Sequence, residues 1–293
     1  MNRRHAKALE TVFVLVPEAA LEAYEAALAA CCETVGFFLA DEDARQWRVE
    51  GVREAGGDDQ ALHDALALAA LATGTAATLG REATEAEGWL ARNQASFPPL
   101  PVGRRFLVQG THAAVRGAPG RMVLTLDAGL AFGSGEHGST RGCLRALEGV
   151  AHRRPRRVLD LGTGSGILAM AAAALLHRPV SGTDIEPWSV RVAGQNARAN
   201  QLGRLVQVQL ADGWRARGLR GPWDLVFANI LARPLCRMAR DLAIRLAPGG
   251  TAILAGLLDW QAAWVLSAHR RHGLVLERRV QEGSWTTLVL RRR

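Results

Sequence analysis

The 293-residue sequence predicts an α/β protein in two parts, a smaller N-terminal α+β domain and a larger Rossmann-like domain with a seven-stranded sheet. A glycine-rich turn, Asp160–Gly166, joins an apolar strand-like run to an alanine-rich helix through Met170 to Leu176. Strand-like and helical segments then alternate toward the C-terminus, as in parallel α/β sheets. The length also fits two domains of ~100–200 residues each.

The N-terminal part predicts elements in the order β-α-β-β-α-β, the order of a ferredoxin-like sandwich. The expected strands are residues 11–16, 35–39, 46–52 and 76–81, and the expected helices are 18–32 and 59–72. We assign this domain to residues 1–82. A linker, stiffened at its end by the prolines of Phe97–Pro101, is expected over residues 83–101.

The larger domain is expected over residues 102–293. Its predicted strands are residues 157–159, 180–184, 205–210, 224–230 and 251–257, followed by a closing hairpin at 274–280 and 284–290. Its predicted helices are residues 170–176 and 189–200, one ending at 246, and one at 260–272. No internal repeat or heptad pattern interrupts this order.

The glycine turn predicts a nucleotide-like cofactor, because closely spaced glycines let the backbone approach a ligand at a helix N-terminus. A dinucleotide fingerprint reads G-x-G-x-x-G/A, but Ile167 follows where its last small residue should be. Asp160, at the strand end, would repel a pyrophosphate but could hold the ammonium of a methionine-like amino acid. The spacing therefore favours S-adenosylmethionine over a dinucleotide.

Polar residues follow the next strands at corresponding positions. Asp184 ends the second strand, where a carboxylate can accept ribose hydroxyls of either cofactor, while Asp212 follows the third and Asn229 ends the fourth. Because ligands bind at the carboxyl ends of parallel strands, these residues and Asp160 are expected to converge on one crevice.

Asn229 is the expected catalytic residue. Methyl transfer needs a free lone pair on the attacking atom, and an amide oxygen can accept N–H groups and aim that lone pair without becoming charged. The alternative is that Asn229 caps the helix before Arg233-Pro234.

Several segments together resemble the PrmA-type methyltransferases, which modify the eleventh protein of the large ribosomal subunit. They are Asn229–Ala232 with Pro234-Leu235, the loop Leu126–Thr140, the block Asp160–Leu168, and Trp89, Asn93, Phe97-Pro98 and Val102-Gly103 in the linker region. The resemblance implies a class I S-adenosylmethionine-dependent fold and transfer of methyl groups to protein amines.

The resemblance also implies residue roles. It assigns the cofactor to Thr140, Asp160, Gly162, Thr163, Gly164, Gly166, Asp184, Asp212 and Asn229, with Asp212 near the adenine. It implies that the N-terminal domain recognises the ribosomal protein, although this domain could instead only stabilise the fold.

One loop departs from the family pattern. The family usually has Thr-His-Pro-Thr-Thr where this chain has Glu136-His137-Gly138-Ser139-Thr140. Glu136 adds a charge beside the expected site, and Gly138 loosens a turn that proline would fix. His137 is expected to be a hydrogen-bonding strut rather than a general base.

Composition limits the partners. The net charge of +8 could suggest nucleic acid, but the arginines are dispersed, and the runs 153–157 and 291–293 lack interleaved aromatic residues. We therefore expect solvated faces rather than direct nucleic-acid binding, with contact to ribosomal RNA during assembly as the open alternative. The cysteines form no disulfide or zinc pattern and no metal is expected. No apolar run reaches membrane-spanning length, which predicts a cytoplasmic protein.

Three function classes remain open. The leading one is a methyltransferase of the eleventh large-subunit protein, beside a lysine methyltransferase of another protein. The second is a dinucleotide-dependent oxidoreductase, which Ile167 and Asn229 disfavour. The third is a catalytically silent assembly factor, which the altered Glu136–Ser139 loop leaves open.

Overall fold

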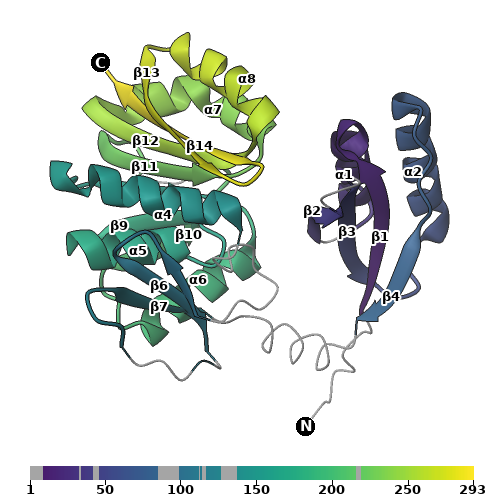
Figure 1. Ribbon diagram of the computed structural model, residues 1–293, viewed down its shortest axis with the longest axis horizontal. Coiled ribbons are helices and arrows are strands. Elements are labelled where there is room, and N and C mark those ends of the chain that lie inside the picture. The colour runs from purple at the N-terminus through teal and green to yellow at the C-terminus, as the bar shows by residue number, and fades with distance from the viewer. Residues whose placement is uncertain are drawn as a thin grey trace. The chain divides into compact units, whose positions relative to one another are not determined.

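The computed structural model describes residues 9–32, 34–41, 46–84, 99–111, 113, 117–126, 137–215 and 219–293. The chain forms two compact units, Met1–Asn93 and Gln94–Arg293 (Figure 1). Most of the expected linker, including Trp89, Asn93 and Phe97-Pro98, lies outside the described residues. The two ends of that expected linker pair in sheets, however, because Gly80–Thr84 forms strand β4 and Leu100–Val102 forms strand β5.

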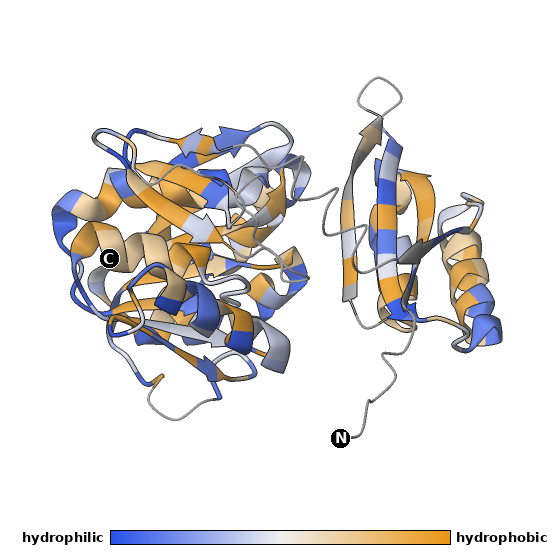
Figure 2. Ribbon diagram, turned by 90° about the horizontal axis from the view of Figure 1, so that it is seen from below, coloured by the Kyte–Doolittle hydropathy of each residue, from blue (hydrophilic) through white to orange (hydrophobic). Residues whose placement is uncertain are grey.

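The smaller unit is a four-stranded antiparallel sheet in the order β2-β3-β1-β4, with two helices. Its remaining elements are β1 (Leu9–Pro17), α1 (Leu21–Ala29), β2 (Thr34–Asp41), β3 (Gln46–Glu54) and α2 (Asp59–Thr73). Hydrophobic and hydrophilic residues alternate along its strands (Figure 2), because successive side chains point to opposite faces. The predicted fourth strand, residues 76–81, was placed too early, since the structure starts it at Gly80.

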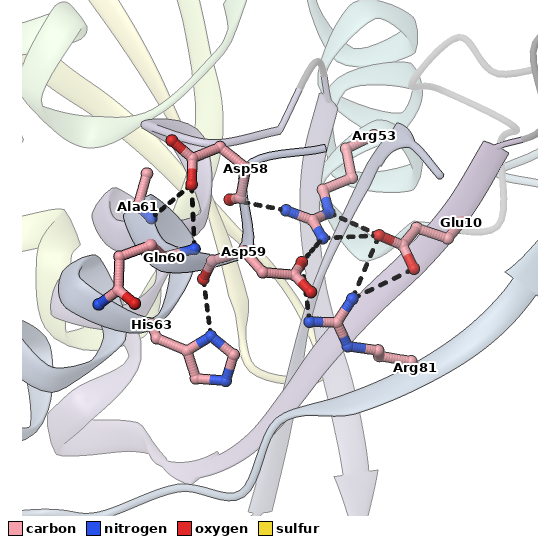
Figure 3. A network of polar contacts seen from close by, with 8 residues as sticks. All are labelled: Glu10, Arg53, Asp58, Asp59, Gln60, Ala61, His63 and Arg81. Atoms are coloured by element: carbon pink, nitrogen blue, oxygen red, sulfur yellow. Dashed lines mark hydrogen bonds and ion pairs between the residues drawn. The ribbon is translucent and has the colours of Figure 1, made fainter. Parts of the chain in front are cut away.

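A polar network holds helix α2 to this sheet (Figure 3). Arg53 of β3 is almost fully buried and donates to Glu10 of β1 at 2.7 Å and to the backbone carbonyl of Asp58 at 3.2 Å. Arg53 and Arg81 of β4 also pair with Asp59 in the first turn of α2. Asp58 caps the same helix by accepting from two backbone N–H groups. The network therefore connects strands β1, β3 and β4 to the N-terminal end of α2.

The larger unit is built on a seven-stranded sheet in the order β10-β9-β8-β11-β12-β14-β13 (Figure 1). The strands are β8 (Val158–Leu161), β9 (Val180–Asp184), β10 (Val206–Leu210), β11 (Trp223–Asn229), β12 (Leu246–Leu258), β13 (Leu274–Glu282) and β14 (Trp285–Arg292). The first five run parallel to one another, and the closing hairpin makes β14 antiparallel to β12. Their parallel carboxyl ends therefore share one edge.

Helices cover both faces of this sheet. The helices are α4 (Gly138–Val150), α5 (Ile167–Leu176), α6 (Pro187–Ala199), α7 (Ala232–Arg245) and α8 (Asp259–Arg270). Leu225 and Phe227 of β11 belong to the core beneath α4 and α5, whereas Val226 and Ala228 belong to the core beneath α7 and α8. Burial on both faces explains why these strands read as continuous apolar runs.

A second, three-stranded sheet in this unit was not predicted. It consists of β5, β6 (Phe106–Gly110) and β7 (Met122–Leu126) in sequence order. Asn200, at the end of α6, accepts from the N–H of Thr125 at 2.8 Å and donates to its carbonyl at 2.6 Å, so a side chain bonds both backbone groups of this residue of β7. Within the described ranges, no helix is long and apolar enough to cross a membrane.

Candidate active site

The glycine turn lies between β8 and α5 and approaches the neighbouring strands closely. Gly162 and Thr163 donate their backbone N–H groups to the carbonyl of Thr183 at 2.8 and 2.9 Å. Gly162, Gly164 and Gly166 all have positive φ, which strains any other residue. A Cβ on Gly162 would lie 2.4 Å from Cγ2 of Ile230, so this position has no room for a side chain.

Asp160 lies beneath this turn with no exposed surface. Its Oδ2 accepts from the hydroxyl of Thr163 at 2.7 Å and from the N–H of Ala169 at 3.2 Å, while its Oδ1 is buried without a hydrogen-bond partner. Burial raises the pKa of Asp160 to about 7, although both hydrogen bonds act in the opposite direction. A buried carboxylate oxygen with no partner is an acceptor available to a cation or an N–H donor.

Asp184, at the end of β9, contacts the same turn. Its Oδ2 accepts from the N–H of Gly164 at 2.8 Å, and its Oδ1 accepts from the N–H of Glu186 at 3.0 Å. Each carboxylate oxygen has two lone pairs, so these bonds leave capacity for the hydroxyls of a ribose. The structure thus connects two predicted cofactor residues, and part of the role of Asp184 is to support the turn.

Asp212 lies at the same edge but differs from the other predicted residues. It follows β10, and the N–H of Ala211 donates to the carbonyl of Asp184 at 2.8 Å. The Asp212 side chain itself is exposed and pairs with Arg215 one turn later. Its carboxylate is therefore engaged at the surface rather than buried with Asp160.

Thr140 and Asn229 meet although 89 residues separate them in sequence. Thr140 is fully buried in the first turn of α4, and Nδ2 of Asn229 lies 3.4 Å from its hydroxyl. The other amide atom, Oδ1, is buried without a partner. Helix α7 is preceded by Leu231 at its cap position, so Asn229 is not the helix cap that the sequence left as an alternative.

His137 precedes α4 and packs against the closing hairpin. Its ring lies 4.1 Å from that of Trp285, and its Nδ1 is 2.7 Å from the hydroxyl of Ser139. Burial, helped by the charge of Arg141, lowers the pKa of His137 to about 4. The ring is neutral at pH 7, and its contacts with Trp285 and Ser139 are of the kind that a strut would make. Glu136 and the preceding loop residues 127–135 lie outside the described residues.

The departure at Gly138 has a packing reason that the sequence does not reveal. A Cβ on Gly138 would lie 2.7 Å from the carbonyl oxygen of Glu282 and 2.8 Å from Cδ1 of Trp285. Trp285 therefore occupies the space that a side chain at position 138 would need. The hairpin restrains the turn from outside, whereas proline would restrain it from within.

Exposed apolar side chains also occur at this edge, and sequence reasoning did not single them out. Ile185 follows Asp184, Leu210 ends β10 and Leu231 follows β11, and all are largely exposed. The sequence feature that could have identified them is an apolar residue at or just after the end of a predicted strand, where the chain leaves the core. Such side chains can cover the apolar parts of a bound nucleoside or substrate.

The arrangement fits a nucleoside cofactor with a cationic end. The turn has room for a backbone approach but not for side chains, Asp160 offers an orphaned acceptor, and Asp184 retains lone pairs. Across the described residues, no group of three or more His, Cys, Asp or Glu side chains is placed to hold a metal ion.

Comparison with known proteins identifies the same chemistry. Residues 10–293 match the family described as "Ribosomal protein L11 methyltransferase (PrmA)". A ribosomal protein L11 methyltransferase of Bradyrhizobium diazoefficiens is 45% identical over 250 residues, covering 84% of each chain. A relative of the same name from Rhodopseudomonas palustris is 44% identical, covering 80% of this chain and 81% of its own.

A solved structure supports the same assignment. The ribosomal protein L11 methylase of Lactobacillus delbrueckii subsp. bulgaricus is 28% identical, with a TM-score of 0.61, over 67% of this chain and 100% of that one. The chain therefore belongs to the ribosomal protein L11 methyltransferase (PrmA) family and is an S-adenosylmethionine-dependent methyltransferase.

Proposed function

We propose that this protein transfers methyl groups from S-adenosylmethionine to amino groups of ribosomal protein L11, on lysine side chains, the N-terminal amine or both. Family membership over nearly the whole chain supports the substrate. The observation that carries the mechanism is the pairing of Thr140 with Asn229, whose Oδ1 is buried and free to accept an amine N–H.

The chemical difficulty lies in the acceptor amine. A lysine amine with a pKa near ~10.4 is protonated at pH 7, and exposing its lone pair costs about 4–5 kcal/mol, whereas an α-amine near ~8 costs only about 1 kcal/mol. A site shielded from water lowers this cost by disfavouring the ammonium. Asn229 then accepts the amine N–H and fixes the direction of its lone pair, and the long contact from Thr140 orients the amide.

The other predicted residues would hold the cofactor, which supplies an electrophilic methyl group when bound. Gly162, Thr163, Gly164 and Gly166 form the backbone surface, Asp160 offers its free oxygen to the amino-acid end, and Asp184 offers its remaining lone pairs to the ribose. Asp212 would join them near the adenine only after leaving Arg215, a cheap step for an exposed pair.

We propose that the two units have separate tasks. The sheet order and the β-α-β-β-α-β sequence support a ferredoxin-like domain at residues 1–82, which would recognise L11, followed by a linker at 83–101. The seven-stranded sheet supports the class I methyltransferase topology for residues 102–293. Replacing residues 1–82 by those of a relative should redirect substrate choice, and an unchanged choice would leave this domain a stabilising role.

The remaining alternatives are weaker. Family membership argues against a dinucleotide oxidoreductase and does not favour a different protein substrate. The relatives are named as methyltransferases, which argues against a catalytically silent assembly factor. A ribosomal substrate and four unbridged cysteines support a cytoplasmic location.

The test is methyl transfer from radiolabelled S-adenosylmethionine to ribosomal proteins of a strain that lacks this enzyme, followed by mass spectrometry. We expect label on amines of L11. Label on another protein would show that L11 is not the substrate. Binding of S-adenosylhomocysteine without any label would show that the protein binds the cofactor but does not catalyse the transfer. Tight binding of NAD but not S-adenosylhomocysteine would reject the cofactor itself.

A further inference from the structure

The two arginine runs of this chain, residues 153–157 and 291–293, meet at one edge of the large sheet. Nη1 of Arg153 lies 2.8 Å from Oε2 of Glu277, and Nη1 of Arg291 lies 3.3 Å from Oε1 of the same carboxylate. Arg153 also donates to the hydroxyl of Thr251 at 2.9 Å, and Thr251 pairs with Arg291 across β12 and β14. Segments far apart in sequence therefore form one basic surface.

A pocket of about 270 Å³ opens in this surface. It is lined by Arg153, Arg154 and Arg156, by Asp224 of β11, and by residues 248–251 of β12. A pocket of this size and composition can admit a phosphate group to several guanidinium donors.

The positive charge of the pocket is offset only in part, because Asp224 is the one carboxylate among its described lining residues. Oδ2 of Asp224 accepts from the backbone N–H groups of Arg156 and Arg157 at 2.8 and 2.9 Å, and Glu277 is already shared by Arg153 and Arg291. Among the residues that the structure describes, no carboxylate pairs with the side chains of Arg154 or Arg156. Both side chains are exposed and available to an anion.

The pocket lies at the opposite end of the strands from the candidate active site. Asp224 is the second residue of β11 and Asn229 is its last, five residues later, a span of about 16 Å at roughly 3.3 Å per residue. An anion held beside Asp224 thus leaves the edge with Asp160, Asp184 and Asn229 open. The two sites can be occupied together.

We propose that this arginine-lined pocket is a binding site for the phosphate backbone of RNA, lined by Arg153, Arg154 and Arg156. Among its described lining residues the pocket offers guanidinium groups and no aromatic side chain on which bases could stack, so we expect its contacts to be with phosphates. The proposal takes up the alternative to solvated faces that the sequence left open for the arginine runs. The inference goes beyond methyl transfer and does not depend on which protein is methylated.

The test is fluorescence anisotropy of the full-length protein with a fluorescein-labelled oligouridylate of about 20 nucleotides, longer than common single-strand site sizes of ~4–16. The double variant Arg154→Gln/Arg156→Gln removes two unpaired charges. We expect its affinity to fall by about tenfold or more at low salt. The slope of log K against log salt should fall by about 1.4, since each phosphate contact on a single strand contributes ~0.7.

The matched control is Arg237→Gln/Arg240→Gln, which removes two exposed arginines of α7 that do not line the pocket. It should keep both the affinity and the salt slope of the unaltered protein, and both variants should keep its melting temperature. If the control variant weakened binding equally, net charge alone would attract the RNA, and the proposal of a binding site at this pocket would be wrong.

Two further results would also overturn the proposal. One is no measurable binding of the oligouridylate by the unaltered protein. The other is binding to phosphatidylglycerol vesicles but not to RNA, which would assign the surface to membranes. Methylation of L11 measured on the same variants should be unchanged, so failure of the RNA site is distinguishable from failure of the proposed enzymatic function.

Discussion

The polar groups of the smaller unit and those of the catalytic edge are arranged in opposite ways. Arg53 is buried, and its donors are distributed over Glu10, Asp59 and the carbonyl of Asp58. At the catalytic edge, by contrast, Asp160 and Asn229 each keep a buried oxygen without a partner. A satisfied network stabilises a fold, whereas an orphaned buried acceptor is retained where a ligand will supply the missing donor.

The largest expected effect is the loss of cofactor binding when the glycine turn at the catalytic edge is substituted. Gly162→Val places a branched side chain where a Cβ alone would lie 2.4 Å from Ile230 and where φ is +69°. We expect binding of S-adenosylhomocysteine to weaken by at least ~100-fold, as measured by calorimetry. Gly194→Ala in α6, whose Cβ would have no neighbour nearer than 3.7 Å, is the control and should bind normally. Normal binding by Gly162→Val would show that the turn does not carry the cofactor.

The next largest expected effect is a loss of stability when Arg53 is removed from the polar network of the smaller unit. Arg53→Met leaves Glu10 without its nearest cation and should lower the free energy of unfolding by about 2–3 kcal/mol, less than for a fully buried pair because Asp59 is 54% exposed. Arg48→Met, in the same strand, loses more exposed partners and should cost about 1 kcal/mol. Chemical denaturation measures both. Equal losses would mean that burial does not distinguish the two arginines.

A third prediction concerns pH. Because burial raises the pKa of Asp160 to about 7, its carboxyl is largely protonated at pH 6 and ionised at pH 8. The ammonium group at the amino-acid end of S-adenosylhomocysteine favours the ionised form, so affinity for this ligand should rise by up to about tenfold between these values. Calorimetry of Asp160→Asn should show weaker binding without this rise. A rise that persists in the variant would assign it to another group.

The same group affects stability in the opposite sense. The folded protein binds the Asp160 proton more tightly than the unfolded chain, in which the pKa of this carboxyl is 3.8. This contribution to stability is therefore present below about pH 4 and is lost as pH rises toward about 7. In Asp160→Asn this part of the pH dependence of the melting temperature should disappear.

The smallest effect tests the strut. His137 has a pKa lowered to about 4, so it stays neutral between pH 5 and 8. His137→Gln should reduce kcat only a few-fold and leave the shape of the pH–rate profile unchanged. Loss of an inflection from that profile, together with a fall of ~100-fold or more, would make His137 a general base.

Local patterns predicted most of the fold because central strands such as β8 and β11 are apolar on both faces, and because α5 and α6 begin at a glycine and a proline. The helices and strands from Val158 to Arg292 fall close to their predicted positions. The small sheet was missed because β6 and β7 are short. In addition, the hydrogen bonds to the backbone of Thr125 in β7 come from Asn200, which is far along the chain. No local pattern encodes that pairing.

The site shows the same division. Strand ends placed Asp160, Asp184 and Asn229 at one edge, because parallel strands share their carboxyl ends. The sequence could not show that Trp285 fills the space beside Gly138, that Asp212 turns to Arg215, or that the arginine runs meet at Glu277. Each depends on side-chain contacts between distant segments or on the direction of one side chain.

The central claim is that Asn229 positions the amine and is not only a cofactor contact, and Asn229→Ala tests it most directly. Single-turnover methylation of L11 gives the rate of the chemical step, and calorimetry with S-adenosylhomocysteine gives cofactor affinity. We predict a loss of about 100-fold in rate with less than about threefold loss in affinity, since a misplaced nucleophile alone can cost ~10²-fold. Equal losses in both would contradict the claim and make Asn229 a cofactor contact only.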